Sequence, residues 1–407
     1  MPFRIALSGL NAAQTDLSVT ANNIANASTA GFKGSRTEFS DVYAVAFEGI
    51  SSLATGNGVA VTGITQNFSQ GNIDFTERNL DIAVSGQGFF VMEDASGQSF
   101  SRAGAFHIDR DGLIVNQGGQ RLQVFPSIAG GTGFNTGVLS DIQLLTSDGP
   151  PQATANIDVT LNLSSSDTVP VTVPFNPTDP TSFNNSTSTV VYDSLGSAHT
   201  STLYYVKSPV LNQWDAYQYV DGNEITSGGV SPISLTFNSD GTLAGPTSIA
   251  YDAVPSGTGA LPIQLDVNYP NSTQFGSSFA VNGLSQDGFT TGRLSGIDID
   301  NEGVVFARFT NGQSNALGKV ALANFANVGG LSQQGDTSWG QTFNSGDLIL
   351  GEANTASFGL VQSGALEASN VDIAASLVNL ITAQRNFQAN AQVISAADTI
   401  TQTIINI

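Results

Sequence analysis

The stretch VDIAASLVNLITAQRNFQANAQVISAADTITQTIINI, residues 371–407, decides the fold of the two chain ends. Its repeating positions are separated by alternating steps of four and three residues, which places one seam along a helix face. They are Ile373, Leu377, Leu380, Gln384, Phe387, Ala391 and Ile394, and the pattern continues to Ile404. Because Ser369 or Asn370 can cap the start, we predict a helix over about 370–405, roughly 50 Å long.

The first residues of the chain carry a matching seam. Its positions are Ala6, Leu10, Ala13, Leu17, Thr20, Ile24 and Ala27. This spacing predicts a second terminal helix, and Gly31 follows where a glycine commonly ends a helix. We predict that residues 1–30 and 365–407 together form a coiled-coil-like core domain.

The C-terminal helix has more apolar surface than one seam needs. Between residues 371 and 407 only Asp372, Arg385 and Asp398 are charged. Apolar residues also lie off the seam, at Val378, Ile381, Val393, Ile400 and Ile405. A helix that is apolar on more than one face is normally buried on more than one face. We expect other copies of the chain to cover both seams and the second face, so that the chain polymerises. The alternative is an antiparallel helix pair within one chain, which leaves the second face unexplained.

Between the ends the sequence predicts strands and turns. Runs such as LDIAV at 80–84 alternate with turn signals such as Asp111-Gly112, and no ten-residue helical pattern intervenes. This favours antiparallel sandwiches or barrels over a parallel sheet. Residues 146–287 hold one basic residue against twelve acidic ones. We therefore predict an outer β domain at 146–287, nested in an inner β domain built from 72–145 and 288–364. Residues 31–71 are predicted to form an extended linker.

The composition excludes several classes of partner. Acidic residues outnumber basic ones 33 to 12, for a net charge of −21, which argues against nucleic acid and anionic membrane surfaces. No apolar run is long enough to span a bilayer, so no membrane insertion is expected. There is no cysteine, which excludes disulfides and thiolate metal sites. The N-terminus lacks the features of a cleaved signal peptide.

No catalytic residue, cofactor or metal site is predicted. His107 and His199 are the only histidines, and neither has the i, i+4 partner of a helical zinc site. The acidic middle of the chain could hide catalytic carboxylates, but the sequence singles out no pair of them. An enzyme is therefore the weaker alternative.

Two weak ligand motifs have simpler explanations. Gly312 and Gly318-Lys319 are spaced one residue too widely for a phosphate loop, and a hairpin is favoured. Residues 298–303 resemble the start of a calcium loop, but Phe309 stands where the bidentate Glu belongs. Because Asp-x-x-Gly recurs at 193–196 and 300–303, a repeated turn is the better interpretation.

The motifs at the two ends resemble one protein family. They read SGLNAA at 8–13, ANNIANA at 21–27 and GFK at 31–33, then GALEASNVD at 364–372 and AQRNFQAN at 383–390. Together they are similar to the bacterial flagellar rod and hook protein family, with the signature residues Asn22, Asn23, Ile24, Ala25, Asn26, Gly31 and Phe32. Interior segments such as LANFAN at 322–327 resemble hook rather than rod members. Residues 44–58 are longer than in the shortest hook proteins.

The resemblance implies a structural subunit of the extracellular flagellar hook, not an enzyme. Such subunits form a bent helical tube that carries torque from rod to filament as a universal joint, around a central export channel. The implied partners are other copies, the distal rod, the hook cap, the hook-filament junction protein and the type III export apparatus, which exports the chain without a cleaved signal peptide. The alternatives are a distal rod subunit and a secreted β-rich adhesin.

The oligomerisation residues predicted on the terminal helices are a single set. They are Ala6, Leu10, Ala13, Leu17, Ile24, Ile373, Leu377, Leu380, Ile381, Gln384, Phe387, Ala391, Ile394 and Ile404.

Overall fold

The computed structural model describes residues 2–42, 56–128, 133–144, 148–257, 259–355 and 357–405. Strands β1 to β28 lie between two terminal helices, α1 (Pro2–Ala25) and α2 (Ile373–Ile405). The prediction of a mainly β chain with helical ends is therefore confirmed. The chain divides into two compact units. Unit 1 is Met1–Leu145, Gly296–Arg308 and Ser314–Ile407, and unit 2 is Thr146–Ser295 and Phe309–Gln313.

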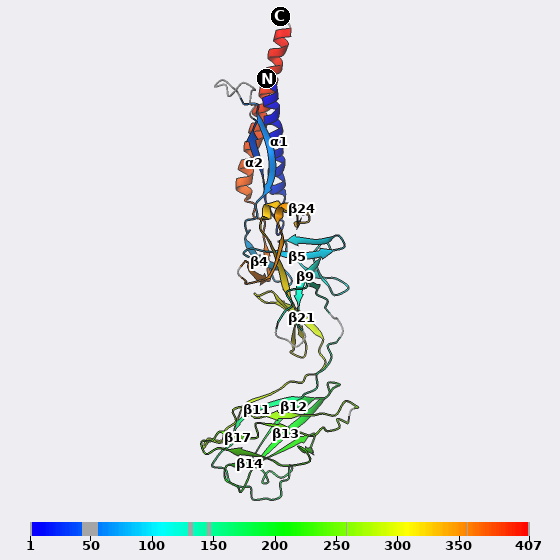
Figure 1. The fold of residues 1–407 in the computed structure, drawn as a ribbon, viewed down its shortest axis with the longest axis vertical. Coiled ribbons are helices and arrows are strands. Elements are labelled where there is room, and N and C mark those ends of the chain that lie inside the picture. The colour runs from blue at the N-terminus through cyan, green and yellow to red at the C-terminus, as the bar shows by residue number, and fades with distance from the viewer. Residues whose placement is uncertain are drawn as a thin grey trace. The chain divides into compact units, whose positions relative to one another are not determined.

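Within unit 1, α1 and α2 pack side by side and antiparallel, so that the N- and C-terminal ends lie at the same end of the pair (Figure 1). The side chain of Asn390 on α2 lies against Gly9 on α1, since a Cβ built on Gly9 would lie 2.7 Å from Oδ1 of Asn390. The chain thus contains the intrachain helix pair that the sequence left as an alternative. Residues of both seams contact each other within one copy, and contacts of the seams with other copies stay a prediction.

Both predicted helix boundaries at this junction need correction. α2 begins at Ile373, and its cap is Asp372, whose Oδ1 accepts hydrogen bonds from the backbone N–H groups of Ala374 and Ala375 at 2.8 and 3.1 Å. A carboxylate in this position satisfies free N–H groups and favours the positive end of the helix. α1 ends at Ala25, before a series of turns, so Gly31 is not its cap.

An antiparallel hairpin of β1 (Ser35–Asp41) and β2 (Val59–Gln66) occupies much of the segment predicted as an extended linker. The hairpin contacts α1, because the backbone N–H of Val59 donates to Oγ of Ser8 at 3.3 Å. A two-stranded sheet is marginal alone, so this support matters. Residues 43–55, which include most of the longer segment 44–58, lie outside the described residues.

The inner β part of unit 1 is built around one sheet with the order β21-β22-β23-β9-β5-β6-β25-β24. These strands are β21 (Leu294–Ile299), β22 (Val304–Phe309), β23 (Ser314–Phe325), β9 (Arg121–Pro126), β5 (Phe89–Asp94), β6 (Gly97–Ser101), β25 (Ser338–Gly340) and β24 (Ser332–Gly335). The short strands β7 (His107–Ile108), β8 (Ile114–Val115), β10 (Ser140–Asp141) and β26 (Leu348–Glu352) pair beside them. The short 3-10 helices η1 (Val328–Gly330) and η2 (Phe343–Ser345) lie between the later strands.

Early and late segments meet in two small antiparallel pairs. β4 (Ile82–Ser85) pairs with β27 (Leu360–Ser363), and β3 (Ile73–Phe75) pairs with β28 (Ala365–Glu367). The neighbouring core contains edge-to-face rings, with Phe100 and Phe325 centroids 4.8 Å apart and Trp339 beside Phe89 at 5.8 Å. Such aromatic pairs contribute roughly 0.5–1.5 kcal/mol beyond burial.

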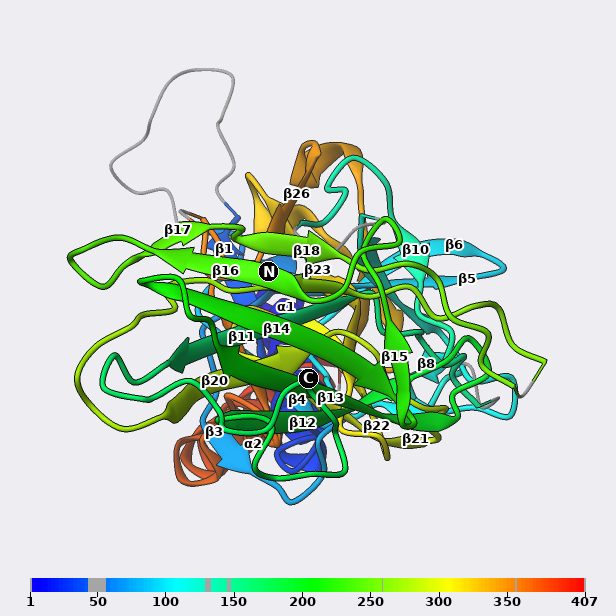
Figure 2. The same ribbon diagram turned by 90° about the horizontal axis from the view of Figure 1, so that it is seen from below.

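Unit 2 is a sandwich of two sheets around one core. The first sheet has the order β18-β19-β11-β20, and the second β12-β13-β14-β16-β17 with β15 beside β14. The strands are β11 (Asn156–Asn162), β12 (Asn185–Tyr192), β13 (Ala198–Lys207), β14 (Gln213–Val220), β15 (Asn223–Ile225), β16 (Ile233–Phe237), β17 (Leu243–Gly245), β18 (Ser248–Ala250), β19 (Asp266–Asn268) and β20 (Ala280–Gln286). Figure 2 labels most of them. β11 and β19 pair in parallel, unlike the antiparallel pairing expected throughout.

The repeated Asp-x-x-Gly pattern forms the turn that was predicted. In the turns at Asp193 and Asp300, a carboxylate oxygen accepts two backbone N–H groups and the glycine N–H bonds to the aspartate carbonyl. Gly196 and Gly303 have φ near +80°, which suits glycine. Asp109 builds a third such turn. These carboxylates therefore organise turns, and Gly312 lies in a hairpin between β22 and β23 as predicted.

The division of the chain differs in detail from the predicted domains. Unit 2 extends to Ser295 rather than to 287, and the terminal helices share unit 1 with β strands. A separate helical domain from 1–30 and 365–407 stays a prediction. Among the described residues, neither helix is long and apolar enough to cross a membrane.

Candidate assembly interface

The seam of α1 is covered within the chain. Ala6 and Ala13 are buried, while Leu10, Leu17 and Ile24 are half-buried. Thr20, which shares this seam, is buried as well. These α1 positions therefore stabilise the helix pair of a single copy, and the set predicted for contacts between copies includes residues that already have partners.

The seam of α2 uses other residues than predicted in one turn. Leu380, Phe387, Ala391 and Ile394 are half-buried, at the spacing expected for the face toward α1. Ala383 is the most buried residue of this face, 1% exposed, whereas the predicted Gln384 is exposed. A small residue lets two helices approach, and a glutamine keeps its amide in water. The helical spacing in the sequence also allows Ala383 on this face, because Ala383 lies three residues after Leu380. Ile404 lies in the last turn of α2, and its side chain is outside what the structure describes.

A second row of predicted residues on α2 has no cover in the described chain. Ile373, Leu377 and Ile381 are 51%, 46% and 47% exposed, and we call these three residues the α2 ridge. They are spaced i, i+4, i+8, and rows of that spacing pack into grooves of other helices or sheets. Burying one such side chain fully contributes roughly 1.5–3 kcal/mol. An exposed apolar row of this kind indicates an interaction site.

Both helices expose further apolar side chains toward the chain ends. Phe3 and Leu7 on α1 and Val393 and Ile400 on α2 are exposed, as is Val378 near the ridge. The last turns of α2 extend past the start of α1 (Figure 1). The pair is thus apolar outside as well as along its seam.

The family-signature residues hold the junction where α1 ends. The side chain of Asn23 donates to the carbonyl of Ser35 at 2.6 Å and accepts from its N–H at 2.9 Å. Asn26 donates to the Asn22 carbonyl at 3.0 Å, and Ile24 and Ala25 form the last turn between them. These contacts fix the exit of the chain from α1 into β1.

Gly31 and Phe32 complete this junction. Gly31 has φ of +70°, and a Cβ there would lie 2.4 Å from the backbone nitrogen of Ala103. Its own N–H donates to the Glu367 carbonyl at 2.7 Å, and Phe32 is buried next to it. Only glycine fits this close approach in this conformation.

A buried ionic cluster joins the same junction to the inner β part. Glu367 is fully buried, and its two oxygens accept from Lys33 Nζ at 2.6 Å and Arg102 at 3.2 Å. Lys33 also donates to the Ser69 carbonyl at 2.8 Å. Burial lowers the pKa values of Lys33 and Arg102, against the opposing effect of Glu367.

Asn370 ties together the three chain segments that pass between helices and strands. Its Oδ1 accepts the N–H of Gly34 at 2.8 Å, and its Nδ2 donates to the carbonyls of Asn67 and Ser69 at 2.7 and 3.0 Å. With the ionic cluster, these bonds make the base of the helix pair a firm support for the ridge. The sequence had offered Asn370 only as a helix cap.

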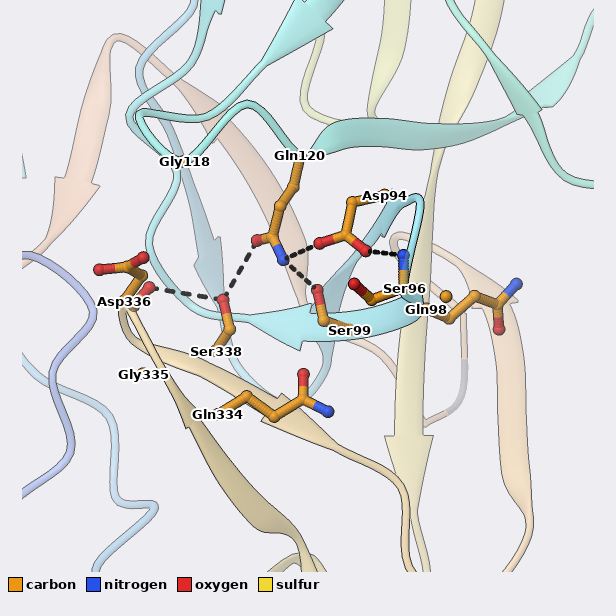
Figure 3. A pocket seen from close by; sticks show the side chains of 11 residues that line it. Asp94, Ser96, Gln98, Ser99, Gly118, Gln120, Gln334, Gly335, Asp336 and Ser338 are labelled. Atoms are coloured by element: carbon orange, nitrogen blue, oxygen red, sulfur yellow. Dashed lines mark hydrogen bonds between the residues drawn. The ribbon is translucent and has the colours of Figure 1, made fainter.

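A separate polar hollow of about 350 Å³ lies in the inner β part (Figure 3). At its centre the amide of Gln120 donates to Asp94 at 3.1 Å and Ser99 at 3.0 Å and accepts from Ser338 at 3.3 Å. The bond from Gln120 lowers the pKa of Asp94. Its described lining contains no histidine, lysine, arginine or tyrosine. The hollow therefore offers hydrogen bonds, and its titratable side chains are the carboxylates of Asp94 and Asp336.

Each of the two histidines lies in a β-strand. His199 in unit 2 lies between two carboxylates, with Nδ1 2.6 Å from Asp221 and Nε2 3.4 Å from Asp193. The bond to Asp221 raises the pKa of His199, although burial opposes it. His107 lies in β7 of unit 1. Both ring nitrogens of His199 therefore have a carboxylate partner within unit 2.

Family models match four parts of the chain. Residues 3–33 match "Flagella basal body rod protein" and 362–407 match "Flagellar basal body rod FlgEFG protein C-terminal". Residues 83–174 match "Flagellar hook protein FlgE/F/G D1 domain", and 160–289 match "Flagellar basal body protein FlaE D2 domain". The matches thus include both terminal helices and both β regions.

Full-length relatives decide the family. The chain is 38% identical over 412 residues to "Flagellar hook protein FlgE" of Escherichia coli strain K12, with 100% of both chains covered. This chain belongs to the flagellar hook protein family. It is also 37% identical to the hook protein of Salmonella typhimurium strain LT2, again over 100% of both chains, and 32% identical to that of Rhizobium meliloti strain 1021, over 100% of this chain and 98% of the relative.

A solved structure agrees with this hook-family fold. The crystal structure of Helicobacter pylori flagellar hook protein FlgE2 is similar with a TM-score of 0.54 at 14% identity, over 72% of this chain and 100% of that one. At this identity the likeness concerns the fold alone. The ridge on α2 is therefore an exposed apolar surface on a protein of the hook family.

Proposed function

We propose that this chain is a structural subunit of the bacterial flagellar hook, and that copies polymerise through the outside of the helix pair. The exposed α2 ridge is the observation that carries the proposal, together with full-length likeness to hook proteins. Copies that bury the ridge remove apolar surface from water, which is the main favourable term in association. The seam residues of α1 and α2 then stabilise the helix pair within each subunit, and the ridge residues make the contacts between subunits.

The hook role brings further proposals by family likeness. The polymer is a bent helical tube outside the cell that transmits torque as a universal joint and encloses an export channel. Its other partners are the distal rod, the hook cap, the hook-filament junction protein and the type III export apparatus, with export that needs no cleaved signal peptide. The likeness to hook relatives over their full length supports this role over a rod subunit or an adhesin.

Electron microscopy of negatively stained material tests the proposal. Purified chains at raised concentration are expected to form tubes. Ile381→Asp should abolish them, since it places a charge in an apolar contact, while Ile381→Leu, the matched control, should keep them. Discrete particles from the unaltered chain, or normal tubes from Ile381→Asp, would refute polymerisation through the ridge.

A further inference from the structure

The β1–β2 hairpin exposes an apolar face of its own. Phe39 pairs with Val61 and Ile64 pairs with Thr37. Since Thr37 and Phe39 are two residues apart on one strand, all these side chains lie on one face of the hairpin. Phe39, Val61 and Ile64 are 46%, 37% and 54% exposed, and we call these three residues the hairpin face.

The opposite face of the hairpin is polar. It carries Arg36 and Glu38, which form an exposed ion pair at 2.7 Å, and Thr65, which donates to Glu38 at 3.0 Å. Alternation of apolar and polar residues is typical of a strand buried on one side. In a single chain the apolar side of this hairpin is nevertheless exposed. The pattern therefore indicates a binding partner for this face outside the described part of the chain.

Charge identifies the partner as another copy. Residues 1–42 and 371–407 contain four basic and five acidic residues, a net charge of −1, while the whole chain carries −21. Two copies repel one another over most of their surface, and the terminal segments are the part of the chain where that repulsion is nearly absent. The electrostatic repulsion that opposes an apolar contact between copies is therefore smallest in the terminal segments.

We propose that the α2 ridge of one copy packs on the hairpin face of the next copy, an inference that rests on the proposed polymerisation. The ridge residues Ile373 and Ile381 are eight positions apart, roughly 12 Å along a helix. Two different surfaces of one chain then meet head to tail. Such a heterologous contact leaves a free ridge and a free hairpin face at opposite ends, so it continues without closing.

A ridge-to-ridge contact would behave differently. It would use the same surface on both copies, and a two-fold contact of that kind closes into a dimer. Growth would then need a further surface. The head-to-tail contact explains in one step why both apolar surfaces are exposed and why subunits can be added repeatedly.

Cysteine cross-linking can test this contact cleanly, because the chain has no cysteine of its own. One set of single variants carries cysteine at Phe39, Val61 or Ile64, and the other at Ile373, Leu377 or Ile381. Polymers are grown from equal mixtures of one variant from each set and then oxidised. Disulfides form only when Cα atoms come within about 7 Å, so the nine combinations sample the register. Circular dichroism of each variant checks that it folds.

The proposal expects at least one of the nine mixtures to give a strong dimer band on a non-reducing gel. It expects each variant polymerised alone to stay monomeric on the gel. Polymers in which no mixture cross-links, or in which a ridge variant cross-links to itself, would overturn the head-to-tail contact but leave the hook role standing. If no tubes form from the unaltered chain, both proposals fail.

Discussion

At the scale of single residues, Glu367 joins several parts of the base of the helix pair. Its buried carboxylate pairs with both Lys33 and Arg102, and its carbonyl accepts the N–H of Gly31. A buried cation without a partner is costly. The signature residues around Gly31 therefore have a structural role within one copy, and this role needs no contact with another copy.

Replacing Glu367 by Gln should destabilise unit 1 strongly. The variant leaves two buried cations without an anion, and breaking a buried pair in this way costs about 3–5 kcal/mol. Thermal unfolding followed by circular dichroism measures the loss. Glu352→Gln is the control, because Glu352 pairs with Lys319 at 2.7 Å but its side chain is 28% exposed. Equal losses in the two variants would contradict the role given to burial.

His199 should make unit 2 depend on pH. The carboxylate of Asp221 raises its folded-state pKa above the unfolded value, which is about 6.5. The interaction is therefore fully present below the unfolded pKa and is lost as pH rises through the folded pKa. The melting temperature of unit 2 should fall across that window, and His199→Gln should remove the change. His107→Gln is the control, and an unchanged pH dependence in His199→Gln would refute the assignment.

At the scale of elements, the helix pair separates two kinds of apolar residue on α2. The side toward α1 is closed by residues such as Ala383 and Phe387, and the ridge is open. The sequence shows that α2 is apolar on more than one face, but it does not tell which face meets α1. That choice depends on how side chains of one helix fit against the other, for example Asn390, whose side chain lies against Gly9.

Aspartate on the two sides of α2 should have different effects on a dilute single copy. Phe387→Asp places a charge in the contact with α1 and should lower the free energy of unfolding by about 1–3 kcal/mol. Ile381 lies on the exposed α2 ridge, so Ile381→Asp should change the free energy of unfolding by less than about 0.5 kcal/mol. Urea unfolding below the concentration at which tubes form measures both. Similar values for the two variants would show that the ridge is not free in the single copy.

The hairpin is the element that the sequence predicted least well. Residues 31–71 are rich in glycine, serine and threonine, which suggested a linker, and the alternation in β2 is interrupted by an irregularity in register next to Phe39. The bulge keeps Val61 and Ile64 on one face although they are three residues apart. A strict period of two could not reveal this. The terminal seam of α1, by contrast, follows a regular helical spacing and was readable directly.

At the scale of the whole molecule, the terminal segments carry almost no net charge, and most of the negative charge lies between them. The chain enters and leaves unit 2 through two adjacent segments. The backbone N–H of Gly149 in the first segment donates to the carbonyl of Gly292 in the second at 2.8 Å. The insertion of an acidic domain could be predicted from charge. Its exact end at Ser295 could not, because that limit depends on contacts rather than on composition.

Excision of residues 150–291 should leave a chain that still polymerises. The flanking residues Gly149 and Gly292 are already hydrogen-bonded neighbours, so a short Gly-Ser turn can join them. The ridge and the hairpin face are untouched by the deletion. Electron microscopy is expected to show tubes. A soluble, folded product that never forms tubes would show that unit 2 supplies an essential contact.

The most direct measurement is the rate at which a thiol-specific maleimide labels Leu377→Cys before and after polymerisation. The unaltered chain contributes no background, since it has no cysteine. Ala383→Cys, in the contact with α1, is the control and should label slowly in both states. We predict fast labelling of Leu377→Cys in the single copy and strong protection in the tube. Equally fast labelling in both states would contradict burial of the α2 ridge between subunits.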